Sequence, residues 1–345
     1  ELGDAAGTRV YVSERGAEPV TASTRRERAL AWIGAIPHWL YPRVLRTHLS
    51  IWIWTIIILG ALGTVMSATG VAVGIWQTRW RRRRRDGRPA TLSPYRTAWM
   101  RWHHLTGLVV GLVTCTWIFS GMMSVTPFDW SPGDHPDRAA RRAFSGGVVT
   151  GAGFDLPPAA VLRGVPAGMD VRELETRLVG GASRWIAFDA HRRAVPLRAD
   201  STPGLLPGLD PRSIEPLAVA AADGAPVATI SLLSAPDDYY YDSVERQRAF
   251  PVVRLDFRDA VASALYVDPV RAELVMRQER RSRWERWLYH GLHDLDFAML
   301  RTRRPLWDAV VILLSIGGLV LSWSGVVVAW RWLAHRWSIP AGPRR

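Results

Sequence analysis

The sequence contains no lysine, so all 44 of its basic residues are arginine. We attribute this to coding bias, and it does not indicate a nucleic-acid surface. The chain has a single cysteine, Cys115, which excludes an intramolecular disulfide. The G-x-S-x-G, H-E-x-x-H, P-loop and G-x-G-x-x-G patterns are also absent. A hydrolase or a nucleotide-dependent enzyme therefore has no support.

Long apolar runs are present instead. Residues 49–76, 102–128 and 309–330 contain no charged side chain. About 20 predominantly apolar residues are needed to span a bilayer, so each run predicts a transmembrane helix. None of the three is N-terminal, which excludes a secretory signal peptide.

The distribution of arginine predicts the orientation of the chain. Nine arginines lie between residues 79 and 101, five of them in the run 81–85. Cytoplasmic loops carry an excess of basic residues, so this segment is predicted to be cytoplasmic. The first and third spans then run inward and the second runs outward. Residues 1–48 and 129–306 are therefore expected on the outer side.

The chain repeats itself at an offset of 255 residues. Residues 11–73 align with residues 266–328 without a gap, and about a third of the paired positions are identical. A long-period repeat indicates one structural unit built twice. In each copy, an extended polar piece precedes a basic, tryptophan-rich stretch with a histidine, and an apolar helix follows.

These features divide the chain into nine segments. Residues 1–24 are predicted to be the tail of a first periplasmic domain, and residues 129–279 a complete one. The stretches 25–48 and 280–306 are interpreted as interfacial amphipathic helices with their connections, because tryptophans alternate with arginines. The spans are assigned to residues 49–77, 102–128 and 307–331. The arginine-rich loop is assigned to residues 78–101, and the cytoplasmic tail to residues 332–345.

The outer domain mixes helix and strand signals. Residues 170–179 and 213–222 predict helices, and residues 202–211 predict a linker between two subdomains. Strands are predicted at residues 9–12, 184–189, 194–198, 229–233, 239–242, 252–257 and 264–267. The predicted fold class is a membrane α-helical protein with a periplasmic α+β domain.

The first repeat copy lacks a counterpart of the 102–128 span and of the domain that follows it. We therefore expect a fourth transmembrane helix and most of a first outer domain upstream of residue 1. The alternative is a naturally short protein with a degenerate first copy.

Histidines gather at the predicted membrane edges. Seven of the nine lie there, and they are His38, His48, His290 and His293 outside and His103, His104 and His335 inside. Neutral imidazole is a common metal ligand and an axial ligand of haem. A histidine cluster at each face would suit two haem b groups that pass electrons across the bilayer.

The outer haem pair is predicted to be His48 with His290 or His293. The inner pair is predicted to take one of the adjacent histidines at the head of the second span. Its partner would be His335 or a histidine of the missing helix. Glycines spaced along single helix faces, such as Gly318 with Gly325, allow close helix packing or leave room for a flat cofactor.

Other interpretations of these residues stay open. Histidine, tryptophan and arginine all favour the membrane interface, so the histidines could be interfacial anchors. His290 and His293 are followed by Asp294 and Asp296, and could form a mononuclear metal site. Residues 237–241, two aspartates and three tyrosines, offer hard oxygen ligands for ferric iron or form an aromatic strand edge.

Four stretches carry a family resemblance. The second span opens Arg-Trp-His-His-Leu-Thr-Gly-Leu (101–108), and residues 287–297 read Trp-Leu-Tyr-His-Gly-Leu-His-Asp-Leu-Asp-Phe. Residues 303–308 read Arg-Arg-Pro-Leu-Trp-Asp, and residues 322–326 read Ser-Trp-Ser-Gly-Val. Over nearly its whole length the chain resembles the PepSY-associated transmembrane (PepSY-TM) family of bacterial inner-membrane proteins.

The resemblance implies a commonly duplicated unit of helix, periplasmic PepSY domain and helix. Some members look like ferric-siderophore reductases that hold haem between their helices. The positions carried over as candidate haem ligands are His103 or His104, His38 and His293.

Two functions follow as hypotheses. The first is a haem protein of the inner membrane that reduces a ferric siderophore or another ferric chelate at the periplasmic face. Its electrons would come from a cytoplasmic or quinol donor. The second is a membrane-anchored PepSY module that binds a peptidase or another partner without redox chemistry.

Overall fold

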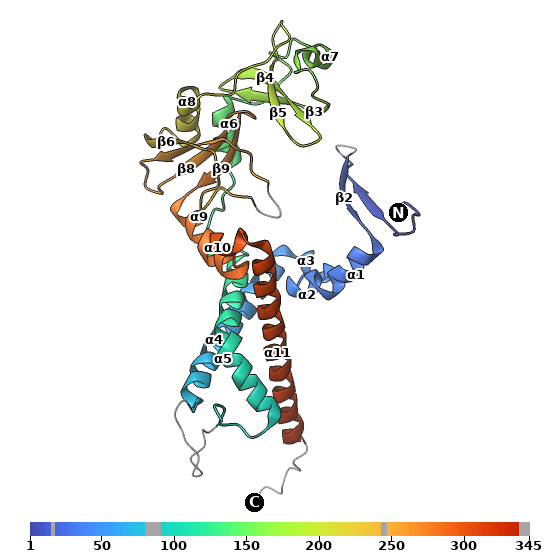
Figure 1. Ribbon diagram of the computed structural model, residues 1–345, viewed down its shortest axis with the longest axis vertical. Helices are drawn as coiled ribbons and strands as arrows, with labels where there is room; N and C mark the ends of the chain where they lie inside the picture. The colour runs from blue at the N-terminus through green and yellow to red at the C-terminus, as the bar shows by residue number, and fades with distance from the viewer. Residues whose placement is uncertain (15–17, 80–90, 243–246, 338–345) are drawn as a thin grey trace, which may run out of the picture. The chain divides into compact units, whose positions relative to one another are not determined.

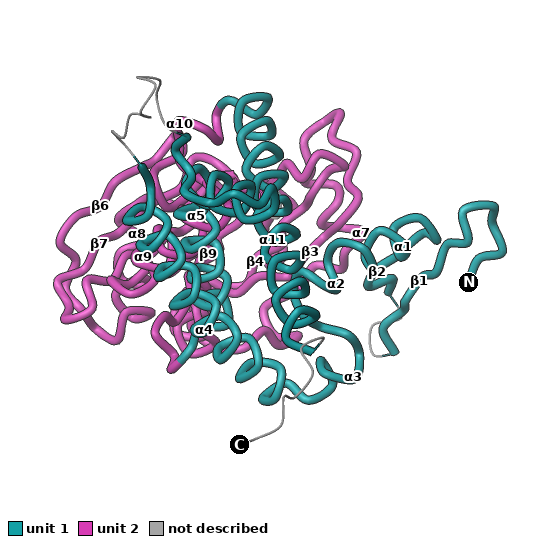
Figure 2. Tube along the Cα trace, turned by 90° about the horizontal axis from the view of Figure 1, so that it is seen from below, with its two compact units in different colours: residues 1–127, 303–345 teal, residues 128–302 magenta. Residues whose placement is uncertain are grey.

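The computed structural model describes residues 1–14, 18–79, 91–242 and 247–337, and Figure 1 shows the path of the chain. The arginine run at 81–85, part of the predicted cytoplasmic loop, lies outside the described residues. The chain divides into two compact units, residues 1–127 with 303–345 and residues 128–302 (Figure 2). We call them unit 1 and unit 2.

Among the described residues, three helices are long and apolar enough to cross a membrane, and all three belong to unit 1: α4 (Leu49–Gln77), α5 (Ala98–Met123) and α11 (Arg304–Trp337). They correspond to the three predicted spans. α5 begins four residues before its predicted start, and α11 ends six residues after its predicted end. Both added segments contain arginine and tryptophan. The spans were predicted from uncharged runs, which stop at an arginine, whereas a helix can continue through arginine and tryptophan. α5 ends before its predicted limit because Pro127 cannot continue it.

α5 packs against both α4 and α11. Small residues make this contact close, because a Cβ atom would lie 2.7–2.9 Å from a side chain of the neighbouring helix at Gly60, Gly111 and Gly317. Gly70 and Gly318, by contrast, have no such atom within 4 Å. The first three glycines therefore serve helix packing, and the other two face open space.

The first sheet of unit 2 has the order β3-β4-β5, with β3 (Val171–Val179), β4 (Ala182–Asp189) and β5 (Ala194–Arg198). The predicted strands at 184–189 and 194–198 are confirmed. The predicted helix at 170–179 is wrong, because these residues form β3. Gly180 and Gly181 both have positive φ and make a tight turn into β4. Pairing with β4 outweighs the helix propensity of the Glu, Leu and Arg residues.

The second sheet has the order β6-β7-β8-β9. Its strands are β6 (Val227–Leu233), β7 (Val252–Phe257), β8 (Ala264–Asp268) and β9 (Glu273–Gln278). The strands predicted at 229–233, 252–257 and 264–267 are confirmed, and β9 is an addition. The strand predicted at 239–242 is wrong. The side chain of Asp237 accepts hydrogen bonds from the backbone N–H groups of Tyr239 and Tyr240, which bends this segment into a turn.

Three helices accompany the two sheets. α6 (Arg138–Ser145) and α7 (Pro158–Val161) precede the first sheet, and α8 (Pro211–Ala221) precedes the second. α8 confirms the helix predicted at 213–222. Asp210 caps it by accepting hydrogen bonds from the N–H groups of Arg212 and Ser213. A helix followed by antiparallel strands thus occurs twice, with α6 and α7 in place of the helix expected at 170–179.

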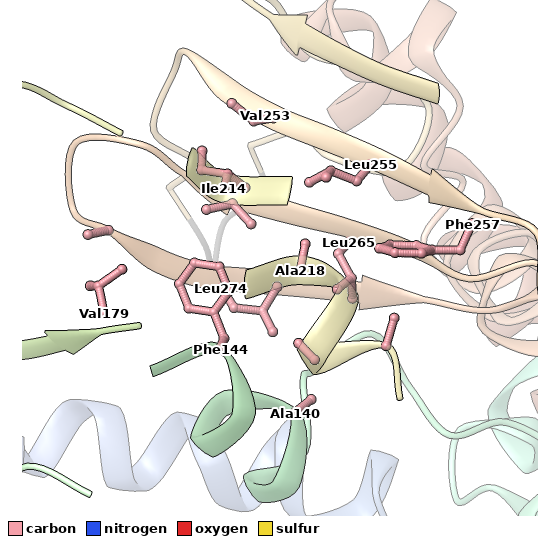
Figure 3. Packing of buried hydrophobic residues seen from close by; sticks show 14 residues of the cluster. Ala140, Phe144, Val179, Ile214, Ala218, Val253, Leu255, Phe257, Leu265 and Leu274 are labelled. Atoms are coloured by element: carbon pink, nitrogen blue, oxygen red, sulfur yellow. The ribbon is translucent and has the colours of Figure 1, made fainter. Parts of the chain in front are cut away.

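The main core lies where α6 and α8 meet the second sheet (Figure 3). Ile214 and Ala218 of α8 are fully buried, together with Val253 and Leu255 of β7 and Leu265 of β8. The apolar side chains of β7 alternate, because successive residues of a strand point to opposite faces. This core holds the helices and the sheet of unit 2 together.

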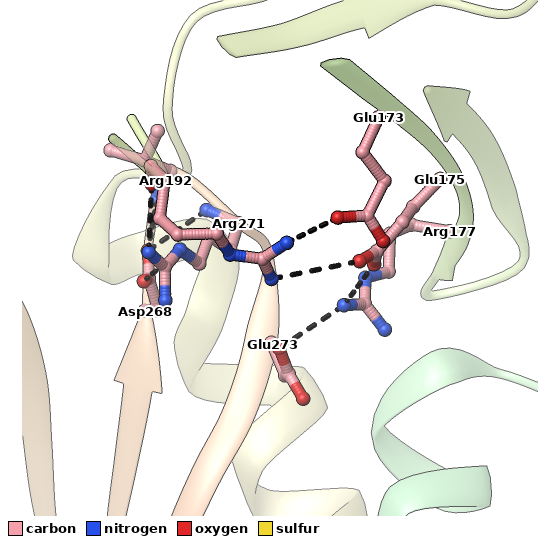
Figure 4. Close-up of polar contacts among 8 residues, drawn as sticks. Glu173, Glu175, Arg177, Arg192, Asp268, Arg271 and Glu273 are labelled. Atoms are coloured by element: carbon pink, nitrogen blue, oxygen red, sulfur yellow. Dashed lines mark hydrogen bonds and ion pairs between the residues drawn. The ribbon is translucent and has the colours of Figure 1, made fainter. Parts of the chain in front are cut away.

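Polar contacts connect the two sheets of unit 2 (Figure 4). Arg177 of β3 pairs with Glu175 at 2.7 Å and with Glu273 of β9 at 3.2 Å. Arg271 donates a hydrogen bond to the backbone oxygen of Arg192 at 3.0 Å. Partly exposed ion pairs of this kind contribute roughly 0–1 kcal/mol each, so they orient the sheets more than they stabilise them.

Unit 1 begins with a β-hairpin and three short helices. β1 (Arg9–Val12) pairs with β2 (Pro19–Ser23), and α1 (Arg25–Ile33), α2 (Ala35–His38) and α3 (Arg43–Arg46) follow. At the 255-residue offset stand β8, β9, α9 (Arg280–Glu285), the π-helical η3 (Arg286–Gly291) and α10 (Ala298–Arg301). The predicted amphipathic helices are thus each interrupted, at Gly34 in the first copy and by the π-helical stretch in the second.

Local contacts also recur at this offset. Arg28 donates a hydrogen bond to the backbone oxygen of Gly7 at 2.9 Å, and Arg283 donates one to that of Ala262 at 2.7 Å. Gly7 and Ala262 both have positive φ. The same turn is therefore held by the same guanidinium contact in both copies.

Candidate functional site

His103 lies in α5 and faces α11. Its Nδ1 atom is 3.1 Å from the Ser324 hydroxyl and 3.3 Å from the backbone oxygen of Leu321. A carbonyl can only accept, so Nδ1 carries the proton in that contact. Gly325 gives the ring its space, because a Cβ atom there would lie 3.2 Å from it. Metal-binding histidines use this arrangement, in which one nitrogen is fixed by an acceptor and the other is presented to the metal.

His104 is the next residue and faces α4, because consecutive helical residues point about 100° apart. The side chain is buried, with 6% of the residue exposed. Its Nε2 atom lies 2.9 Å from the backbone oxygen of Gly74 and 3.3 Å from the Thr78 hydroxyl. His104 therefore links α5 to α4 through Nε2. Within the described residues, its buried Nδ1 atom has no hydrogen-bond partner.

The other predicted ligands of unit 1 are exposed. His335 is ten residues beyond Gly325 on α11, which is about 15 Å along the helix axis. It does not meet the turn of α11 that holds His103. His38 ends α2, and His48 immediately precedes α4.

His290 and His293 belong to unit 2, His290 within η3 and His293 two residues after its end. The Nδ1 atom of His290 lies 3.2 Å from a carboxylate oxygen of Asp294. The ring of His293 stacks on Tyr289, with 5.4 Å between the ring centroids. In the part of the chain that the structure describes, no group of three or more His, Cys, Asp or Glu side chains is placed to hold a metal ion. The mononuclear site at His290 and His293 stays a prediction.

The outer haem pair stays a prediction, because His48 belongs to one compact unit and His290 and His293 to the other.

The space around the spanning helices limits where a porphyrin could lie. Packing at Gly60, Gly111 and Gly317 closes the α4–α5 and α5–α11 interfaces at those levels. Gly318 is seven residues from Gly325, so both lie on one face of α11, about 10 Å apart. Gly318 has no neighbouring side-chain atom within 4 Å. His103 would thus be able to hold a haem group, with open space at Gly318 on the helix face that carries its contacts.

A buried cluster of side chains around Arg286 of η3 was not predicted from the sequence. Arg286 is 5% exposed, and it donates hydrogen bonds to the backbone oxygens of Asp238 at 3.0 Å and Asp296 at 2.6 Å. The ring of Tyr241 contacts two guanidinium groups, with its centroid 4.7 Å from the Cζ atom of Arg286 and 3.8 Å from that of Arg301. Burial raises the pKa of the Tyr241 phenol well above its usual range. Two features of the sequence could have indicated this cluster: the three consecutive tyrosines at 239–241 and an arginine, Arg286, between two tryptophans.

A second tyrosine group lies nearby in unit 2. Tyr266 of β8 stacks on Tyr240 with 5.3 Å between the centroids, and its hydroxyl donates to Asp237 at 3.0 Å. Burial raises the pKa of Tyr240 to about 12. Asp237 also pairs with Arg254 at 3.1 Å. The predicted iron-ligand cluster at 237–241 is thus engaged in packing and internal hydrogen bonds.

The first copy contains a pocket among its short helices α1, α2 and α3. Its volume is about 360 Å³, and it is lined by Trp32, Ile36, Tyr41, Pro42, Arg43, Arg46 and Thr47. At the 255-residue offset, Tyr41 and Arg46 correspond to Asp296 and Arg301. Arg301 stacks on the Tyr241 ring, and the Asp296 carboxylate interacts with its hydroxyl.

Comparison with known proteins gave no match to a family model, to a curated protein or to a solved structure. The PepSY-TM resemblance therefore stays a prediction that rests on the motifs at 101–108 and 287–326.

Proposed function

We propose that the chain is a haem-binding electron-transfer protein of a bacterial inner membrane, with unit 2 in the periplasm. Electrons from a cytoplasmic or quinol donor would reach a ferric siderophore or another ferric chelate on the outer side. The reduced iron would then leave, because hard oxygen donors hold iron(II) less well than iron(III). The recurrence of the Arg28 and Arg283 contacts supports one unit built twice.

The observation that carries the proposal is the anchored ring of His103. Haem b would supply one-electron exchange between iron(III) and iron(II). Ser324 and the Leu321 carbonyl fix the His103 ring and its tautomer, so Nε2 would be the atom that holds the haem iron. A second ligand to the same haem would come from a histidine of another helix, because His335 lies about 15 Å along α11 from the turn that holds His103. An outer haem would use His48 with His290 or His293.

The experiment is an optical spectrum of the detergent-solubilised protein from haem-replete cells, before and after dithionite. We expect a haem spectrum with a sharp band on reduction, and His103→Ala should remove the part of it that belongs to the inner haem. His104→Ala should keep it, because His104 already bonds to a helix carbonyl through Nε2. His191→Ala, an exposed residue of unit 2, is the control. A colourless preparation, or a spectrum indifferent to His103→Ala, would overturn the proposal.

A second candidate is a membrane-anchored module that binds a peptidase or another partner without redox chemistry. The tight packing at Gly60, Gly111 and Gly317 favours it, because an anchor needs no space for a cofactor. This function predicts that His103→Ala and His293→Ala keep full activity, while changes in unit 2 abolish it.

A further inference from the structure

We propose that the edge of β6 that faces away from β7 is a contact surface for a second copy of this chain. The second copy pairs its own β6 antiparallel to this edge, about a two-fold axis at Ile230. The four-stranded sheets of two copies then join into one continuous sheet. This inference stands apart from the haem proposal, because it uses residues of unit 2 alone.

β6 is an edge strand of the second sheet, as Figure 1 shows. Among the strands that the structure describes, it pairs with β7 alone. The other edge strand, β9, differs, because the N–H group of Arg277 donates to the backbone oxygen of Asp134 at 3.0 Å. The free edge of β6 therefore presents N–H and C=O groups that can accept another strand.

The apolar side chains of β6 extend the main core beyond its helical cover. Ile230 lies opposite Leu255 of β7, and Leu232 lies opposite Val253. Opposite residues share a face of the sheet, so all four lie on the face that carries the main core. Leu255 and Val253 are fully buried, whereas Ile230 is 36% exposed and Leu232 is 59% exposed. An uncovered apolar stripe thus runs beside the open edge.

The absence of charge on β6 favours a second copy as the occupant. Residues 225–236 contain no charged side chain, although 22% of the residues in the chain are charged. Edge strands are commonly protected by charged side chains, and this one is not. About a two-fold axis, a strand meets itself, so a charge near the axis would face a like charge. An uncharged strand meets this requirement of self-pairing.

The sequence of β6 is also complementary to itself. A register centred on Ile230 pairs all seven residues of the strand with the second copy. Thr229 then lies opposite Ser231, which is a favourable hydroxyl pair. Ala228 lies opposite Leu232, so a small side chain meets a large one. Ile230 and Leu232 of both copies share one face and close a single apolar stripe across the axis.

The first test places charges at the axis of the full chain in detergent. The parent should form a dimer in sedimentation velocity experiments. Ile230→Glu and Ile230→Lys each set like charges face to face, so each should raise the dissociation constant at least about tenfold. A one-to-one mixture of the two variants should dimerise again, because opposite charges then meet. Val148→Glu, at an exposed apolar position of unit 2, is the matched control and should dimerise like the parent.

The second test measures the register and uses a milder substitution. Cys115 is the only cysteine of the chain, so Cys115→Ser supplies a background without thiols. In that background, Ile230→Cys should be cross-linked to a second copy by a short thiol-specific reagent, because opposite Cβ atoms lie about 5 Å apart. Val148→Cys should not be cross-linked.

Three outcomes would overturn the inference. They are a parent chain that is monomeric at every concentration tested, a dimer that Ile230→Glu leaves intact, and cross-linking that is equal at Ile230→Cys and Val148→Cys. A mixture of Ile230→Glu and Ile230→Lys that stays monomeric would also contradict it, provided that circular dichroism shows both variants to be folded.

Discussion

Burial changes the chemistry of single side chains in unit 2. Asp268 is 2% exposed, and its Oδ1 atom accepts hydrogen bonds from the N–H groups of Val270 at 2.9 Å and Arg271 at 2.8 Å. Removal from water disfavours the charged form, and this effect exceeds that of the hydrogen bonds. The pKa of Asp268 is therefore raised above its usual 3.8.

A raised pKa in the folded state gives Asp268 a defined pH dependence. The folded chain binds the proton more tightly than the unfolded chain, so stability falls as pH rises from about 4 through the raised pKa. Asp268→Asn removes the titrating carboxyl and with it this pH dependence. The difference in melting temperature, variant minus parent, should therefore increase from acidic to neutral pH. Asp210→Asn is the control with the opposite sign, because helix-capping hydrogen bonds lower the pKa of Asp210. Parallel curves for parent and Asp268→Asn would contradict this assignment.

The sequence predicted those helices and strands that are determined by their own residues and not by distant contacts. The three spans, α8 and five of the strands of unit 2 follow from apolar runs and β-branched residues. β3 was predicted as a helix, because its preference for strand comes from pairing with β4 across a glycine turn. The role of Tyr241 was not predictable, since it depends on Arg286 and Arg301, far along the chain. His103 was predicted as a candidate, but the choice of α11 as its neighbour required the helix packing.

The end of α6 depends on a glycine. Gly146 has φ of +74°, and a Cβ atom there would lie 2.4 Å from the backbone nitrogen of Gly181. Gly146→Ala should lower the free energy of unfolding by roughly 2–4 kcal/mol, from backbone strain and steric overlap. Gly224→Ala is the matched control, since Gly224 also has positive φ but open space around it, and should lower it by about 1 kcal/mol. Thermal denaturation measures both, and equal losses would exclude the steric contribution.

Assembly of the whole molecule in the membrane depends on the close contact of three helices. Gly317 and Gly318 of α11 allow two effects of a larger side chain to be compared, which are steric overlap with α5 and higher helix propensity. Gly317→Leu should destabilise the solubilised protein by roughly 1–3 kcal/mol, because a Cβ atom at Gly317 would already lie 2.7 Å from Val110. Gly318→Leu should leave stability unchanged or raise it by up to about 1 kcal/mol through helix propensity. Melting temperatures in one detergent compare the two, and a larger loss at Gly318 would contradict the packing described here.

The adjacent histidines of α5 bond to helices on two different sides. In an apolar three-helix bundle, many rotations of the central helix about its own axis bury similar surfaces. His103 bonds to α11 and His104 to α4, so a rotation of α5, or a slide by one residue, breaks both bonds at once. Apolar packing alone would leave several rotations of α5 nearly equal in energy. The two histidines thus favour one of these rotations over the others.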